Sequence, residues 1–283
     1  MHMISFKQYL AEGRGKAVSA EAFIKWAEEN CSKYLNGKKF LFRGFSHGDS
    51  GIMIGNSAGE KPRASVGGIP NNYTLWIDGH PAFKDFPKRS RSFIATTNLT
   101  KAGDFGSPHI MFVKDTDKIA AVHMGDIWVK NILPEVNLHD FNEITETMLL
   151  KYGLGHNKKY FKLQNSLKHI TLKRLREWFD SPNIETHIAP LVFHIIKKME
   201  NKKWNDLWEV WDGLVSPNIF GLTTIADIEP IVGEVWVDGE CGFLALESKQ
   251  MQAADKEIIS AWLKEKNTEL FNVVTNLWNR SNQ

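Results

Sequence analysis

The chain has 283 residues, of which 42% are hydrophobic and 24% charged, a composition typical of an ordinary globular protein with one large domain or two. Lys and Arg exceed Asp and Glu by only two, so net charge gives no reason to expect a nucleic-acid or membrane partner. Cys31 and Cys241 lie far apart, which argues against a Cys-based metal site and fits a reducing compartment. No apolar stretch approaches the roughly 20 residues of a membrane span.

The sequence pattern of residues 4–12 predicts a short amphipathic helix, followed by a basic, Gly-containing link at 13–16. One interpretation is a terminal helix that packs on the body of the protein. The segment also resembles the capsid-targeting peptides of internal head proteins in T-even-like phages, which end in Leu-x-Glu before a small residue. Here Leu10-Ala11-Glu12 precedes Gly13. The resemblance implies packaging into a phage head and cleavage after Glu12 by the prohead protease.

Residues 19–35 have helical spacing, with Ser19 as the expected N-cap. A strand is predicted at 39–44, and apolar residues on both of its faces indicate that it is buried. This strand ends in Arg43-Gly44. The Arg43 guanidinium can bind a phosphate in a bidentate way, and Gly44 lets a ligand approach the backbone. The alternative is a solvated arginine at a strand end.

Residues 45–75 are rich in Gly, Ser and Asn and predict a long loop, and residues 81–91 predict a basic connector. A short strand is then expected at Phe93-Ile94. It ends in Thr96-Thr97-Asn98, which can cap a following short helix. A strand that ends in hydroxyls is a natural site for a polar ligand, although Ser and Thr are also favoured at such ends for capping alone.

Two further strands are predicted at 109–113 and 118–122. Residues 126–219 then change to helical periodicity and predict a helical insertion. Its cationic face can meet an acidic partner or can simply be solvated. The basic residues of this face are Lys158, Lys159, Lys162, Lys168, Lys173, Arg174 and Arg176. Residues 234–246 predict a hairpin that turns at Asp238-Gly239, and the chain beyond Ser248 is mostly helical.

Three of these features follow one another in an order that resembles the Arg–Ser-Thr-Ser–Glu class of ADP-ribosyltransferases. They are Phe42-Arg43-Gly44, the stretch 93–98 with Ala102 and Phe105-Gly106 behind it, and Glu234 at the head of the late hairpin. The resemblance covers roughly residues 38–125 and 220–247. It implies an α+β fold, with an ADP-ribosyltransferase-like split β-sheet core, an inserted helical region and flanking N- and C-terminal helices.

The expected organisation has four parts. A capsid-targeting-like peptide and linker occupies 1–16, and the first half of the core occupies 17–125. The helical insertion occupies 126–219, and the second half of the core, with the catalytic Glu hairpin and a C-terminal helix, occupies 220–283.

The resemblance further implies NAD as the co-substrate. In this class the Arg contacts NAD, the hydroxyl-rich strand shapes the nicotinamide pocket and the Glu holds a ribose hydroxyl. Carried over, the catalytic set is Arg43, Thr96 and Glu234, and the expected NAD-binding residues are Arg43, Gly44, Ser92, Thr96, Thr97 and Phe105. No metal is expected. A carboxylate suits the reaction because cleavage of the bond between ribose C1′ and nicotinamide builds positive charge on the ribose.

Two positions depart from the pattern of the class. Ala95 stands where the first Ser would be, so the hydroxyl that positions the Glu is missing or comes from Ser92 or Thr97. Val232 stands where many arginine-modifying members carry a Glu, so arginine is not supported as the target. Glu240, beyond the turn, is a weaker candidate than Glu234.

The leading hypothesis is an NAD-dependent mono-ADP-ribosyltransferase that is packaged in the interior of a phage head and delivered to the host cytoplasm. Its acceptor is a host macromolecule, with protein favoured over RNA. Two alternatives stay open: a catalytically inactive ADP-ribosyltransferase-like binding module, and a structural internal head protein. The sequence leaves the acceptor, the modified residue and the oligomeric state open.

Overall fold

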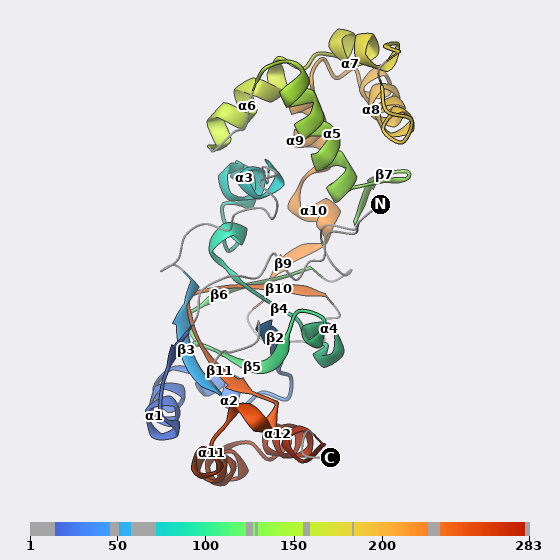
Figure 1. Ribbon diagram of the computed structural model, residues 1–283. Coiled ribbons are helices and arrows are strands. Elements are labelled where there is room, and N and C mark those ends of the chain that lie inside the picture. The colour runs from blue at the N-terminus through green and yellow to red at the C-terminus, as the bar shows by residue number, and fades with distance from the viewer. Residues whose placement is uncertain are drawn as a thin grey trace. The chain divides into compact units, whose positions relative to one another are not determined.

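The computed structural model describes residues 15–45, 51–57, 72–122, 127, 130–154, 159–182, 184–225 and 233–280. The Leu10-Ala11-Glu12 motif and Val232 lie outside these residues. The chain divides into two compact units (Figure 1). Unit 1 comprises residues 1–63, 86–123 and 223–283, and unit 2 comprises residues 64–85 and 124–222.

Unit 1 is built on two sheets, in which every strand pair of defined register is antiparallel. The five-stranded sheet has the order β1-β3-β11-β5-β2, with β1 Lys16–Ala17, β2 Leu41–Phe45, β3 Ile52–Asn56, β5 Ser107–Val113 and β11 Glu240–Ala245. The four-stranded sheet has the order β4-β10-β6-β9, with β4 Phe93–Ala95, β6 Lys118–Val122, β9 Leu222–Thr224 and β10 Glu234–Asp238. The structure is therefore a mixed α+β protein with antiparallel sheets.

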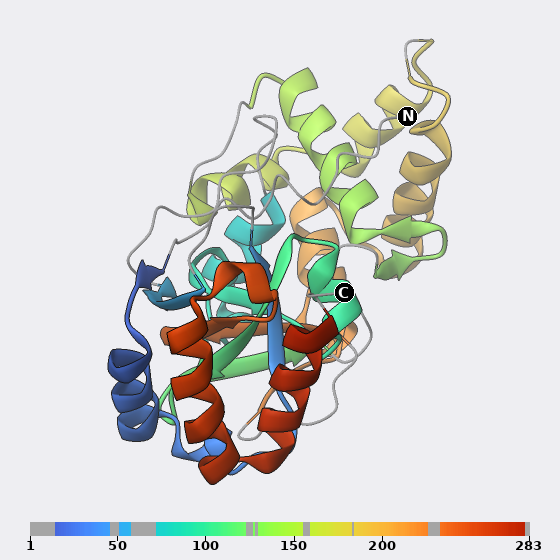
Figure 2. The same ribbon diagram turned by 60° about the horizontal axis from the view of Figure 1, so that its bottom comes forward.

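An apolar core fills the space between the two sheets, and a second core lies on the outer face of the five-stranded sheet. Alternation along β2 shows the division, because Leu41 and Phe45 belong to the inner core while Phe42 belongs to the outer one. Helices cover the outer face (Figure 2). They are α1 Ala20–Asn30, α2 Ser32–Leu35, α4 Leu99–Gly103, α11 Ala253–Lys266 and α12 Thr268–Arg280.

Several local predictions are confirmed. The predicted strands at 39–44, 93–94 and 118–122 correspond to β2, β4 and β6. Ser19 is an N-cap, since its side chain accepts a hydrogen bond from Ala22 N at 3.3 Å. The single helix predicted over 19–35 is instead two, because α1 ends at Asn30 and α2 begins at Ser32.

The loop predicted over 45–75 is wrong in part. It contains β3, which pairs with β1 on one side and β11 on the other, and the first residues of α3 Asn72–Gly79. Ile52 and Ile54 favour a strand, but this short β signal lies within residues rich in Gly, Ser and Asn that favour a loop.

The hairpin predicted at Asp238-Gly239 is also wrong. β10 and β11 follow one another but belong to different sheets, because β10 pairs with β4 and β6 while β11 pairs with β3 and β5. Ser57 binds the residue that joins β10 to β11. Its backbone N donates to Gly239 O, and Gly239 N donates to its Oγ, both at 2.8 Å. A Cβ at Gly239 would overlap the carboxylate of Asp117.

The described residues of unit 2 are mainly helical and include a short hairpin, which the sequence did not predict. The hairpin pairs β7 Asn131–Leu133 with β8 Val136–Asn137. The helices are α3 Asn72–Gly79, α5 Leu138–Lys151, α6 Tyr160–Lys168, α7 Leu172–Phe179, α8 Ala189–Lys202, α9 Leu207–Leu214 and α10 Pro217–Phe220. None of the helices in the described ranges is long and apolar enough to span a bilayer.

Candidate functional site

The strands that carry Arg43, Thr96 and Glu234 meet at one edge of unit 1. Phe42 N donates to Thr96 O at 2.7 Å and Thr96 N donates to Phe42 O at 2.9 Å, which joins β2 to the end of β4. β4 in turn pairs with β10 through Ala95 and Val235. Continued by one residue, this register places Thr96 across from Glu234. Three segments far apart in sequence are thus adjacent in the fold.

Glu234 is buried, with 6% of its surface exposed. Its Oε1 accepts a hydrogen bond from Trp236 Nε1 at 2.7 Å and lies 2.7 Å from Arg89 Nη2. Its Oε2 is buried and has no hydrogen-bond partner among the described residues. One oxygen of the carboxylate is therefore held in place, and the other has no donor among the described residues.

Arg89 is the residue that sequence analysis missed. Its side chain is fully buried, pairs with Glu234 and lies with its Cζ 5.6 Å from the centre of the Trp236 ring. Arg89 sits in a 3-10 turn, Arg89–Arg91, directly before β4. The Ser92 hydroxyl donates to Lys88 O at 2.9 Å and closes this turn. The only sequence signal was the basic connector at 81–91, immediately upstream of β4.

Arg43 occupies the inner side of β2, between the two sheets. Its guanidinium donates to Ile94 O at 2.7 Å and lies over the rings of Phe45 and Phe93, at 5.1 and 5.4 Å from their centroids. Only 2% of its surface is exposed. Arg43 is thus not the solvated strand-end arginine of the alternative interpretation. Its observed contacts fix β4 against β2.

A buried histidine lies beside Arg43 on the adjacent strand of the five-stranded sheet. His109 is the cross-strand partner of Arg43 in the β2–β5 pairing, and its Nδ1 lies 2.9 Å from Ser107 O. Its ring makes an edge contact with Phe45 at 4.9 Å between centroids. The sequence predicted a strand at this position but no role for His109. Arg43 and His109 together place two polar side chains inside an otherwise apolar layer.

Gly44 and Phe105 serve packing in this structure. A Cβ at Gly44 would overlap Ala102 O and crowd Phe105. The groups that approach the Gly44 backbone are therefore Ala102 of α4 and Phe105 just beyond it, not a ligand. Phe105 N donates to Ala102 O at 3.1 Å, just past α4. The glycine therefore lets β2 and α4 pack closely.

The hydroxyl-rich end of β4 has a defined geometry. Thr96 is buried and its Oγ1 accepts a hydrogen bond from Asn98 N at 3.1 Å, while Thr97 is half-buried. The Asn98 side chain caps α4 by accepting from Lys101 N at 3.1 Å, as predicted. Ala95 belongs to the inner core. Since side chains alternate along a strand, a hydroxyl at position 95 would face that core, and Thr96 is the hydroxyl on the side of Glu234.

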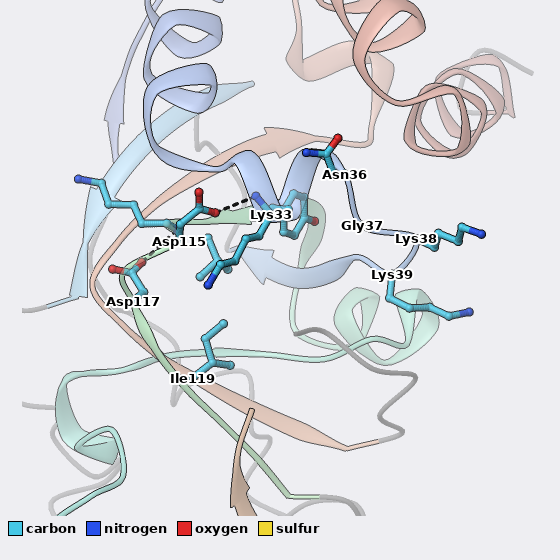
Figure 3. A pocket seen from close by; sticks show the side chains of 11 residues that line it. Lys33, Asn36, Gly37, Lys38, Lys39, Asp115, Asp117 and Ile119 are labelled. Atoms are coloured by element: carbon cyan, nitrogen blue, oxygen red, sulfur yellow. Dashed lines mark hydrogen bonds between the residues drawn. The ribbon is translucent and has the colours of Figure 1, made fainter. Parts of the chain in front are cut away.

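A separate pocket of about 360 Å³ lies elsewhere in unit 1 (Figure 3). It is lined in part by Lys33, Lys38, Asp115, Asp117 and Ile119. Ile119 pairs with Val237, whereas Glu234 pairs with Val122 at the other end of β6. The pocket is therefore distinct from the site around Glu234.

The two aspartates of this pocket are engaged with the protein itself. Asp115 accepts hydrogen bonds from Ser32 N at 3.0 Å and Lys33 N at 2.9 Å and so anchors the start of α2. Asp117 accepts from Lys114 N at 3.2 Å, and burial raises the pKa of its carboxyl to about 6.

Glu240, the weaker candidate, has surroundings that parallel those of Glu234. Its Oε1 accepts from Trp26 Nε1 at 2.7 Å and pairs with Lys114 Nζ at 2.9 Å. These contacts, the lysine first, hold the pKa of Glu240 below its usual value. No cluster of three or more His, Cys, Asp or Glu side chains within the described ranges is arranged to hold a metal ion.

Comparison with protein-family models, with curated proteins and with solved structures finds no match to this chain. The geometry of the site is therefore the basis for any functional conclusion.

Proposed function

We propose that the chain is an NAD-dependent mono-ADP-ribosyltransferase with Glu234 as its catalytic carboxylate. The observation that carries the proposal is the state of that carboxylate, which is buried, oriented through one oxygen and without a donor at the other among the described residues. Buried polar atoms without partners are rare in native structures and call for an explanation. The 2′-hydroxyl of the NAD ribose is a donor that would satisfy Oε2.

The chemistry that follows is a displacement at ribose C1′. The bond from C1′ to nicotinamide breaks, nicotinamide leaves with the electron pair, and the acceptor forms the new bond at C1′ and loses a proton. Positive charge grows on the ribose in between, and a carboxylate held at the 2′-hydroxyl stabilises it. Arg89 and Trp236 fix the rotamer of Glu234, so the carboxylate itself does not have to reorient during the reaction.

Arg43 acts in this proposal through β4. Its hydrogen bond to Ile94 O holds the strand whose end carries Thr96 next to β10. The proposal therefore assigns Thr96 and Glu234 to the nicotinamide side of the site and gives Arg43 a positioning role. Contact between Arg43 and the NAD phosphates stays a prediction of the family resemblance.

Delivery in a phage head and a host acceptor belong to the same proposal, and their support is the Leu10-Ala11-Glu12 motif before Gly13. A second candidate is an inactive ADP-ribosyltransferase-like binding module. It is favoured by one observation: Arg43 and Glu234 are both almost fully buried and both held by other protein groups.

Incubation with labelled NAD separates the candidates. The purified protein is titrated with NAD in a calorimeter and then incubated with labelled NAD and a bacterial lysate. A transferase binds NAD and moves label to a lysate component. An inactive module of this fold transfers no label whether or not it binds NAD, and a structural head protein shows neither binding nor transfer. Absence of transfer at every NAD concentration up to the millimolar range contradicts the proposal.

A further inference from the structure

Positive charge is concentrated in one part of unit 2. Residues 147–176 include eight lysines and arginines and not a single aspartate or glutamate. The whole chain has only two more basic than acidic residues, so the rest of it is net acidic. A near-neutral total charge therefore hides a strongly basic segment, and charge asymmetry of this kind indicates a polyanionic partner.

Helix α6 presents one face of this segment outward. Leu163 and Leu167 are fully buried, and α6 packs on α3 and α9. The positions on the opposite side are exposed, and at 100° per residue they fall within one arc of the helix. They are Phe161, Lys162, Asn165, Lys168 and His169. Phe161 is 54% exposed, the highest value among the exposed large apolar side chains of the described residues.

The lysines of α6 differ from the cations of α7 in their partners. On α7, Arg176 pairs with Glu200 at 2.7 Å and Lys173 lies 3.9 Å from Glu177. Within the described ranges, Lys159, Lys162 and Lys168 have no carboxylate at ion-pair distance. Lys168 Nζ lies 5.6 Å from the centre of the half-buried Trp208 ring. Lys159 and Lys162 are therefore available to a partner, whereas the Lys168 ammonium also interacts with the Trp208 ring and electrostatically with Asp206.

We propose that this α6 basic surface, defined by Phe161, Lys162 and Lys168 with Lys159 at the helix N-cap, binds single-stranded nucleic acid. Lysines that are not paired within the protein attract phosphates, and an exposed aromatic ring gives an unpaired base a surface on which to stack. A duplex keeps its bases stacked on one another and gives Phe161 no such role. A purely acidic peptide without apolar side chains would satisfy the lysines but leave the exposed ring uncovered. The proposal goes beyond the transferase assignment and does not depend on it.

The test is binding of a fluorescein-labelled 20-nucleotide single strand, followed by anisotropy at several salt concentrations. One variant replaces Lys159, Lys162 and Lys168 with Gln. The matched control replaces Lys25, Lys84 and Lys264, three exposed lysines outside the surface, and so makes the same change in net charge. A third variant, Phe161→Ala, removes the ring from an exposed position where folding does not depend on it.

The expected result is a loss of affinity in the α6 triple variant that the control triple does not show. The slope of log affinity against log salt should fall in magnitude by about 2, because each phosphate contact to a single strand contributes about 0.7. Phe161→Ala should weaken binding about tenfold. Equal losses in both triple variants, stronger binding of the matching duplex, or equal binding of polyglutamate without an effect of Phe161→Ala would each overturn the proposal.

Discussion

At the scale of single residues, the pair of Glu234 and Arg89 dominates the candidate site. Both side chains are removed from water, 5% and 0% exposed, with 2.7 Å between Oε1 and Nη2. Desolvating two charges is expensive, and the pair is sustained by its short distance and by the Trp236 hydrogen bond. Removing one partner strands the other as a buried charge.

This coupling predicts a specific pattern in a double-mutant cycle. Glu234→Gln and Arg89→Met should each lower the free energy of unfolding by about 3–5 kcal/mol, since each leaves one unpaired buried group. The double variant should lose clearly less than the sum of the two single losses. Urea unfolding followed by circular dichroism measures all four proteins. Additive losses would show that the two side chains do not interact in solution.

Asp117 predicts a pH dependence of stability. Burial raises the pKa of its carboxyl in the folded protein to about 6, above the value in the unfolded chain. Between these two values the folded state binds more protons, so this group makes the protein lose stability as pH rises from about 4 to about 6.

In Asp117→Asn that contribution is absent, while an amide oxygen can still accept from Lys114 N. The difference in unfolding free energy between wild type and variant should change across this window and level off above it. The measurement is urea unfolding at a series of pH values, and a pH-independent difference would rule out the raised pKa.

At the scale of elements, the close packing of β2 against α4 explains why position 44 is a glycine, which the sequence predicted to be an NAD-binding residue. Gly44→Ala should destabilise the protein by about 1–3 kcal/mol, because the added methyl overlaps the Ala102 carbonyl. Gly103→Ala, in α4 itself, is the matched control. Nothing lies within 4 Å of its added methyl, so it should be neutral or gain up to about 1 kcal/mol. Thermal unfolding compares the two, and equal effects would contradict this account of Gly44.

The sequence predicted elements well where the signal was local. The strand at Phe93-Ile94 and the cap at Asn98 could both be inferred from residue type and spacing. β3 and the crossing from β10 to β11 could not, because both depend on which distant strand offers a free edge. Arg89 was missed for the same reason, since a basic residue in a connector gives no local sign of a buried partner 145 residues later.

At the scale of the whole molecule, the site around Glu234 lies within unit 1 and the α6 basic surface within unit 2. Unit 1 also contains both cysteines, and both are fully buried. Burial is the main reason that the pKa of each thiol is raised, so neither is a nucleophile in the folded protein.

Thiol labelling should therefore report on unit 1 alone. Native protein should leave Cys31 and Cys241 unmodified by iodoacetamide over hours, and both should react at once in urea. Peptide mass spectrometry identifies the modified residue. Rapid labelling of either cysteine without denaturant would contradict the packing of α1 and β11 described above.

The central claim is that Glu234 is a catalytic carboxylate toward NAD, and the rate of nicotinamide release tests it most directly. Glu240 offers a matched control, because it too accepts from a Trp indole and pairs with a cation. Glu234→Gln should lower the rate about 10²–10³-fold, and Glu240→Gln should leave it within a few-fold of wild type. Glu234→Asp, which retains a charge for Arg89, separates catalysis from folding and should also be strongly impaired. Equal rates for wild type and a folded Glu234 variant, or no release by wild type, would contradict the claim.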